Sequence, residues 1–105
     1  MNKIFFSPEA EKDLLEIKQY IKTELLNEKA AKNTVSKIIR SIKTLLEFPE
    51  SGTPLSAVIG FETDYRFLVC GNYITFYRFR DNSVYIIRIL YGKRNYMQIL
   101  FGGIS

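Results

Sequence analysis

The C-terminal part of this chain contains three strand-like runs separated by two short turns. The runs are Tyr65–Cys70, Tyr73–Phe79 and Val84–Tyr91, and they are rich in β-branched and aromatic residues. The intervening dipeptides, Gly71-Asn72 and Asp81-Asn82, are typical of two-residue hairpin turns. The segment therefore predicts a three-stranded antiparallel meander.

The residues before the meander predict one strand and two helices. Lys3–Phe6 is a short apolar run, and Ser7-Pro8-Glu9 supplies an N-cap, a first-turn proline and a first-turn acid for a helix that we expect to end at Asn27. Apolar residues recur at helical spacing in two stripes: Leu14, Ile17, Ile21 and Leu25, then Ala31, Val35, Ile38, Ile42 and Leu45. The two stripes predict a pair of antiparallel helices.

These elements predict an α+β fold. We expect one N-terminal strand, an antiparallel helical hairpin and a three-stranded antiparallel meander that forms one sheet with helices on one face. Phe48–Asp64, which contains two prolines and two glycines without apolar periodicity, is expected to be a loop between helices and sheet. A chain of 105 residues has room for one core, so we expect residues 1–105 to be a single domain.

The two predicted turns set a register that assigns side chains to faces. Arg66 is expected opposite Tyr77 and Tyr77 opposite Ile86, while Thr75 lies between Leu68 and Arg88. The predicted helix-covered core consists of Phe67, Val69, Ile74, Phe76, Ile87 and Ile89. The other face is expected to be open, and it carries Arg66, Arg88, Tyr73, Thr75 and Tyr77 with Leu68, Cys70, Val84, Ile86 and Leu90.

Basic residues are concentrated in the meander. Residues 1–64 hold nine Lys and Arg against ten Asp and Glu, and residues 65–105 hold six against one, so −1 and +5 give the net charge of +4. Five of the six arginines are in the second part: Arg66, Arg78, Arg80, Arg88 and Arg94. Arginine binds phosphate and carboxylate through a fixed fork of donors, so this part predicts a surface for nucleic acid or an acidic protein segment.

Composition excludes several classes of chemistry. The chain has no histidine and one cysteine, which excludes a conventional zinc site and histidine-dependent catalysis, so we expect no metal and no cofactor. Any catalysis must use Arg, Lys, Tyr, Glu or Asp. The sequence also shows no leader pattern and no apolar run of about eighteen residues, from which we expect a cytoplasmic protein without a membrane partner.

The order of elements and several segments resemble the RelE/ParE superfamily, the small toxins of bacterial type II toxin–antitoxin modules. The likeness covers nearly the whole chain, including SPEAEKDLLEIKQYI and FPESGTP, and it is strongest in YRFLVCGNYITFYRF and VYIIRILYGKRNYMQIL. It implies a toxin of a plasmid-stabilisation-like module that arrests growth and is neutralised by a cognate antitoxin. By position it implicates Arg66, Arg94 and Arg88, and Tyr77 lies beside Arg66 in the predicted register.

The resemblance has two branches with different targets. RelE-like toxins cut mRNA on the ribosome, using lysines upstream of the first meander arginine and a late tyrosine. Here Gly52–Tyr65 contains no lysine and the tyrosine position is Leu100, so a nuclease would depend on Arg66 and Arg94 with Tyr91 or Tyr96. The FYR and IIRIL segments are closer to ParE-like toxins, which poison DNA gyrase.

Three functions follow as hypotheses. The first is a ParE-like gyrase poison, the second a ribosome-dependent mRNA endonuclease, and the third a non-toxic RNA-binding module in which Tyr73 and Tyr77 stack bases. For the antitoxin, we expect an exposed apolar strip of Leu68, Val84, Ile86 and Leu90 to be the docking surface, with antitoxin acids near Arg66 or Arg88.

Overall fold

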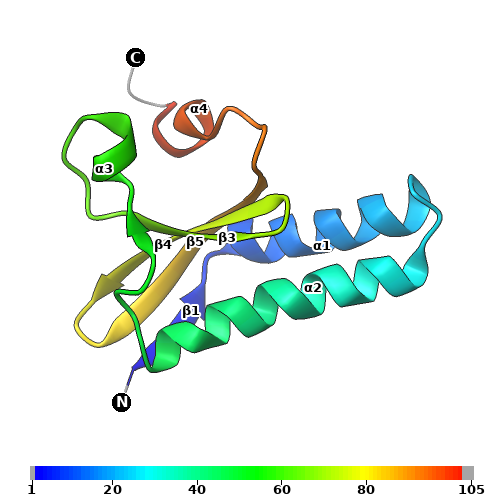
Figure 1. Cartoon of the computed structure of the whole chain (residues 1–105), viewed down its shortest axis with the longest axis horizontal. Coiled ribbons are helices and arrows are strands. Elements are labelled where there is room, and N and C mark those ends of the chain that lie inside the picture. Colours follow the sequence, from blue (N-terminus) through cyan, green and yellow to red (C-terminus); the bar gives the residue numbers. More distant parts are fainter. Residues whose placement is uncertain (1, 103–105) are drawn as a thin grey trace.

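A five-stranded mixed sheet and a pair of long helices form the protein in the computed structural model, which describes residues 2–102 (Figure 1). The strands are β1 (Lys3–Phe6), β2 (Thr53–Pro54), β3 (Arg66–Cys70), β4 (Tyr73–Arg80) and β5 (Ser83–Tyr91). The helices are α1 (Pro8–Thr23), α2 (Glu28–Lys43), α3 (Ser56–Ile59) and α4 (Tyr96–Phe101), with a 3₁₀ turn at Thr44–Leu46. Element order and fold class agree with the prediction.

The strand order is β1-β5-β4-β3-β2, and β1 is parallel to β5 while the other pairs are antiparallel. Both predicted turns are present. Asp81 and Asn82 have φ values of 51° and 60°, which a two-residue hairpin turn requires and which Asp and Asn tolerate better than most residues. The predicted pairs Arg66 with Tyr77 and Tyr77 with Ile86 are confirmed.

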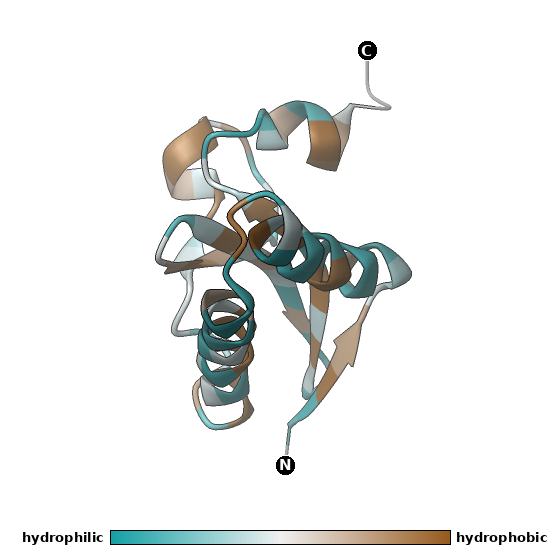
Figure 2. Cartoon of the chain, turned by 90° about the vertical axis from the view of Figure 1, so that its right-hand side faces the viewer, coloured by the Kyte–Doolittle hydropathy of each residue, from teal (hydrophilic) through white to brown (hydrophobic). Residues whose placement is uncertain are grey.

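The first long helix begins as the sequence predicts, but it ends at Thr23 rather than at Asn27, because Asn27 caps the second helix. The Ser7 hydroxyl accepts from the Ala10 N–H at 3.0 Å, and the Asn27 side chain accepts from the Ala30 N–H at 2.9 Å, so each helix has an N-terminal cap. Hydrophobic and hydrophilic residues alternate along both ribbons, as expected of helices with one buried side (Figure 2). The buried residues are Ala10, Asp13, Ile17 and Ile21 in α1, Ala31, Ile38 and Ile42 in α2, and Leu45 in the following turn.

The predicted assignment of the sheet faces is wrong. Helices α1 and α2 pack on the face that carries Tyr77, Val84, Ile86 and Ile89, together with the partly buried Leu68, Cys70, Tyr73 and Phe79. Of the six residues predicted to lie under the helices, Ile89 alone does. Alternation divides a strand into two faces, but here both faces are apolar, so it does not determine which face the helices choose.

A β-bulge between Phe76 and Tyr77 adds a second error. Opposite Tyr77 lies Ile86, but the next pair is Phe76 with Arg88, so Ile87 is the extra residue of β5. Arg88 therefore pairs with Phe76 rather than Thr75, and Thr75 pairs with Ile89. A two-residue turn fixes register only until a bulge changes it.

The proposed exposed apolar strip does not exist in this fold. Val84 and Ile86 are fully buried beneath the helices, Leu90 is buried on the opposite face, and Leu68 is partly buried. These side chains are core residues. An antitoxin cannot dock on them while the helices stay in place.

Short helices that the sequence did not predict cover part of the second face. Leu55 from the loop, Phe76 and Leu90 form a second buried cluster, and residues of α3 and α4 pack around it. Both helices lie at one end of the sheet, away from β1 (Figure 1). Within residues 2–102, none of the helices combines the length and the hydrophobicity that a membrane-spanning segment needs.

Candidate functional site

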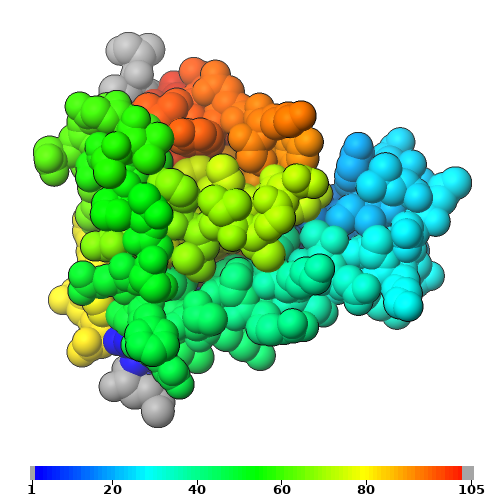
Figure 3. Space-filling model, viewed as in Figure 1, coloured from blue at the N-terminus to red at the C-terminus, as the bar shows by residue number. Residues whose placement is uncertain are grey.

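A groove of about 560 Å³ lies where the C-terminal half of α1 passes the β3–β4 turn and the end of β5. Figure 3 shows the surface hollowed between the yellow-green tip of the β3–β4 hairpin, the orange segment before α4 and the blue end of α1. Its lining residues are Asp13, Glu16, Ile17, Tyr20, Leu25, Asn72, Tyr73, Ile89, Leu90, Tyr91 and Arg94. We call this site the tyrosine groove.

Three tyrosines give the groove its character. The rings of Tyr73 and Tyr91 meet edge to face with centroids 5.9 Å apart, and Tyr20 adds a third phenol from α1. Burial raises the pKa of Tyr73 above its ordinary value of 10.0, and the neighbouring phenols of Tyr20 and Tyr91 act in the same direction. Tyr73 is therefore a neutral hydrogen-bonding group rather than a proton acceptor at neutral pH.

Arg94 is the exposed cation of the groove. It follows β5 in a turn that is tied back to the sheet, because the Gly92 N–H donates to the Asn72 carbonyl at 2.8 Å and the Arg94 N–H donates to the Tyr91 carbonyl at 2.9 Å. These bonds hold the backbone of Arg94 near Tyr91. Tyr91 and Arg94, which the sequence analysis names as candidate site residues, thus lie in the same groove.

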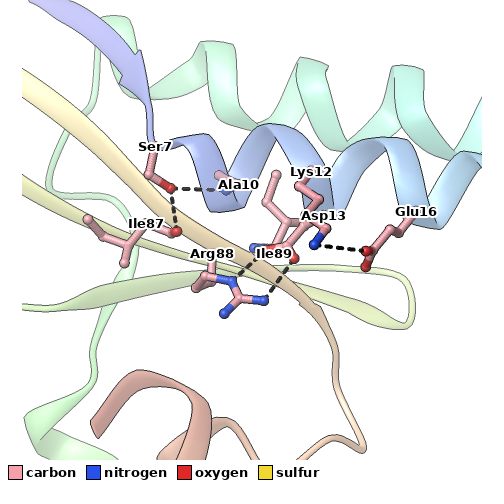
Figure 4. Close-up of polar contacts among 8 residues, drawn as sticks. All are labelled: Ser7, Ala10, Lys12, Asp13, Glu16, Ile87, Arg88 and Ile89. Carbon is pink, nitrogen blue, oxygen red and sulfur yellow. Dashed lines mark hydrogen bonds and ion pairs between the residues drawn. The ribbon is translucent and has the colours of Figure 1, made fainter. Parts of the chain in front are cut away.

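Arg88, another predicted contact residue, is occupied by Asp13 (Figure 4). Its Nε and Nη2 donate to the two carboxylate oxygens at 2.8 and 2.9 Å, and the Ile89 N–H donates to the same carboxylate at 2.9 Å. The hydrogen bonds that Arg88 donates to Asp13 raise the pKa of Arg88 and keep its guanidinium charged. Arg88 thus connects β5 to α1, and its role as a target contact stays a prediction.

The Asp13 contact has a backbone cause. Strand β1 ends at Phe6, which leaves the remaining edge of β5 without a neighbouring strand. Ser7 and Asp13 supply the hydrogen bonds that a neighbouring strand would make. The Ser7 N–H donates to the Ile86 carbonyl, and the Ser7 hydroxyl donates to the Ile87 carbonyl at 2.7 Å. The Asp13 carboxylate accepts from the Ile89 N–H. Asp13 is thus the acceptor that an unpaired strand edge requires.

Arg66 and Tyr77 hold a loop rather than forming an open binding surface. The Arg66 guanidinium donates to the carbonyls of Glu50 and Gly52 at 3.0 and 2.9 Å and lies 3.6 Å from the Glu50 carboxylate. The Tyr77 hydroxyl donates to the Pro49 carbonyl at 2.8 Å and accepts from the Gly52 N–H at 2.9 Å. Tyr77 is buried, so it cannot stack on a base.

The predicted catalytic set is divided among three places. Arg66 pairs with Tyr77, four residues along β4 from Tyr73, which is about 13 Å at the usual rise of a strand. Tyr96 packs on the opposite face of the sheet, where its ring centroid is 5.2 Å from that of Phe76. Only Tyr91 and Arg94 remain together.

Arg78 and Arg80 form an ion-pair cluster with Asp64. Arg78 donates to both carboxylate oxygens at 2.9 and 3.0 Å, and Arg80 donates at 2.9 Å. The hydrogen bond from Arg78 lowers the pKa of Asp64 against the opposing effect of burial, and Arg80 lowers it further. No group of three or more His, Cys, Asp or Glu side chains within residues 2–102 is arranged to hold a metal ion.

Sequence reasoning missed Tyr20, Leu25 and Asn72 as lining residues of the tyrosine groove. Tyr20 and Leu25 are 55 % and 59 % exposed, and an aromatic residue near the end of a helix is the sequence signal that points to this surface. The Gly71-Asn72 pair predicts a turn, and nothing in the sequence indicates that Asn72 also lines a groove.

The strand, helical hairpin and meander resemble the folds of two solved structures. A chain from the chromosomal ParDE toxin–antitoxin system of P. aeruginosa superposes with a TM-score of 0.69 at 21 % identity, covering 87 % of this chain and 95 % of that one. YafQ from E. coli strain BL21(DE3) superposes with a TM-score of 0.51 at 21 % identity, covering 97 % and 100 %. At such identities the likeness establishes the fold.

The sequence identifies the family. The sequence model of the family described as ParE toxin of type II toxin–antitoxin system, parDE, matches residues 4–96. This chain therefore belongs to the ParE toxin family. No curated protein sequence matches it significantly. The resemblance stated from the sequence is thus confirmed, and the protein is a toxin of a type II toxin–antitoxin module.

Proposed function

We propose that this toxin arrests growth by binding DNA gyrase, that the tyrosine groove with Arg94 contributes to the target contact, and that a cognate antitoxin neutralises it. The observation that supports binding over cleavage is the separation of the predicted catalytic residues: Arg66 fastens a loop, Tyr96 packs on the far face, and Tyr91 and Arg94 stand in the groove.

The chemistry of the groove also favours binding. Cleavage of RNA through its 2′-hydroxyl needs a group that takes a proton and cations that hold the developing charge. The Asp13 carboxylate already accepts from three donors, and burial raises the pKa of Tyr73, so that its phenol is neutral at neutral pH. Arg94 and three phenols can bind a carboxylate and apolar side chains of a protein partner.

Growth measurements with paired variants test the role of the groove. Arg94→Ala and Tyr91→Ala remove exposed groove side chains, and we expect each to relieve growth arrest while leaving the fold intact by circular dichroism. Arg40→Ala, which removes an exposed arginine from α2, is the matched control and should remain toxic. Full toxicity of folded Arg94→Ala, Tyr91→Ala protein would exclude the groove from target binding.

The same experiment separates Arg66 from Arg94. Because Arg66 fastens the Glu50–Gly52 segment, its replacement by alanine should lower both toxicity and stability, whereas Arg94→Ala should lower toxicity alone. Co-expression of a cognate antitoxin should restore growth. A folded, stable and non-toxic Arg66→Ala variant would move the target contact toward β3.

A further inference from the structure

The second face of the sheet is uncovered at the end away from α4, and its side chains form an ordered grid. The registers place Phe5, Tyr85 and Arg78 in one row across β1, β5 and β4, and Lys3, Ser83 and Arg80 in the next row. Strand neighbours lie about 4.8 Å apart, and residues two apart on a strand share a face. We call these two rows, with Asp64, the sheet platform.

The platform is open to solvent. Phe5 is 48 % exposed and Tyr85 is 40 % exposed, while the opposite side of the same strands is buried under α1 and α2. The second buried cluster, around which α3 and α4 pack, contains Phe76 but neither Phe5 nor Tyr85. Large aromatic side chains are seldom left exposed side by side without a use.

The two aromatic rings are arranged for stacking. Their centroids are 5.6 Å apart and their planes differ by 18°, so Phe5 and Tyr85 form an offset parallel pair. Such a pair can be extended by another planar ring, and every nucleobase has a face that stacks on an aromatic side chain.

Cations flank the aromatic pair. Lys3, Arg78 and Arg80 contribute three positive charges, and Asp64 contributes one negative charge, so the platform carries a net charge of +2. Asp64 accepts from both arginines and holds their planes in place, but each guanidinium has five N–H donors and keeps free ones. Arginines held in this way are preorganised for phosphate oxygens.

We propose that the sheet platform binds single-stranded nucleic acid, with bases stacked on Phe5 and Tyr85 and phosphates held by Lys3, Arg78 and Arg80. An acidic peptide would use the cations but would gain only apolar contact from the rings. A nucleic acid strand matches both rows, since it carries planar bases and phosphates together. This activity goes beyond the proposed gyrase contact and is measured without gyrase.

Fluorescence anisotropy of the full-length chain with labelled oligodeoxythymidine and with labelled oligouridine tests the platform. We expect binding that weakens with salt, with a slope of log affinity against log salt of about −1.4 to −2.1 for two to three neutralised phosphates. Tighter binding of one of the two oligonucleotides shows whether the platform prefers DNA or RNA. Absence of binding to both at low salt would overturn the proposal.

Variants at Tyr85 separate stacking from general apolar contact. Tyr85→Phe should bind as the native chain does, and Tyr85→Leu should bind about 5- to 100-fold more weakly because a base loses its stacking partner. Leu15→Ala, which changes an exposed apolar residue on α1, is the matched control. Equal binding by Tyr85→Leu and Tyr85→Phe would contradict the stacking role.

A charge variant and a competing ligand complete the test. Arg80→Gln should weaken binding and reduce the salt slope by about 0.7, whereas Lys22→Gln on α1 should change neither. The labelled oligonucleotide is then displaced with polyglutamate and, separately, with unlabelled oligonucleotide. If polyglutamate displaces it at a lower concentration than the unlabelled oligonucleotide does, the platform is assigned to an acidic protein segment instead.

Discussion

The hydroxyl of Tyr77 lies against the backbone of Gly52, and no side chain fits between them. A Cβ atom at Gly52 would lie 2.5 Å from the Tyr77 oxygen and 2.9 Å from the Phe67 carbonyl oxygen. The Gly52 N–H donates to the same hydroxyl at 2.9 Å. The loop therefore reaches the sheet only because residue 52 is glycine.

We predict that Gly52→Ala destabilises the protein by about 1–3 kcal/mol, as overpacking of a close contact does. The measurement is the free energy of unfolding in urea. Ser51→Ala, at the exposed neighbouring position, should change that free energy by less than about 0.5 kcal/mol. Equal stability of the two variants would show that the loop is not held against Tyr77.

We predict that Tyr77→Phe lowers the free energy of unfolding by about 1–3 kcal/mol, because it leaves the Gly52 N–H and the Pro49 carbonyl without their partner. Tyr91→Phe removes a hydroxyl from a partly exposed ring and serves as the control. If both variants unfold at the same urea concentration, the two hydrogen bonds of Tyr77 contribute nothing measurable.

We predict that Asp13→Ala lowers the free energy of unfolding by about 3 kcal/mol, since it leaves Arg88 and the Ile89 N–H without an acceptor. The control is Glu16→Ala, which breaks an exposed pair with Lys12 at 4.0 Å and should cost less than about 0.5 kcal/mol. Thermal and urea unfolding measure both. Similar losses in the two variants would rule out a special role for Asp13.

We predict a specific acid dependence for the Asp64 cluster. The folded-state pKa of Asp64 is lowered, so its stabilising contribution is present above the ordinary value of 3.8 and is lost as pH falls through the lowered folded-state pKa. The difference in unfolding free energy between the native chain and Asp64→Asn should therefore shrink toward zero in acid. A difference that stays constant from neutral pH to strong acid would contradict this assignment.

The parts of the fold that were predictable from the sequence are those set by local chemistry. The Ser7 cap, the two hairpin turns and the pairing of Arg66 with Tyr77 depend on residues close together in the chain or joined by a short turn. The choice of the helix-covered face depends on shape complementarity across the core. Alternation could not supply it, because Phe76 and Leu90 on one face are as apolar as Tyr77 and Ile86 on the other.

The candidate site was predictable only in part for a similar reason. Tyr91 and Arg94 are neighbours in sequence, and they do share the tyrosine groove. Arg88 and Asp13 are 75 residues apart, and nothing local indicates that they pair. One signal was present: Asp13 occupies a buried position between Ala10 and Ile17 on α1, and a carboxylate on an apolar stripe usually has a buried partner.

The most direct test of the proposed function uses purified toxin with DNA gyrase and, separately, with ribosomes translating a defined message. We predict inhibition of plasmid supercoiling with accumulation of the cleaved gyrase–DNA complex, loss of both effects in Arg94→Ala, and no toxin-dependent cuts in the message. Normal gyrase activity together with new toxin-dependent 3′ ends by primer extension would contradict the proposal and assign the toxin to ribosome-dependent mRNA cleavage.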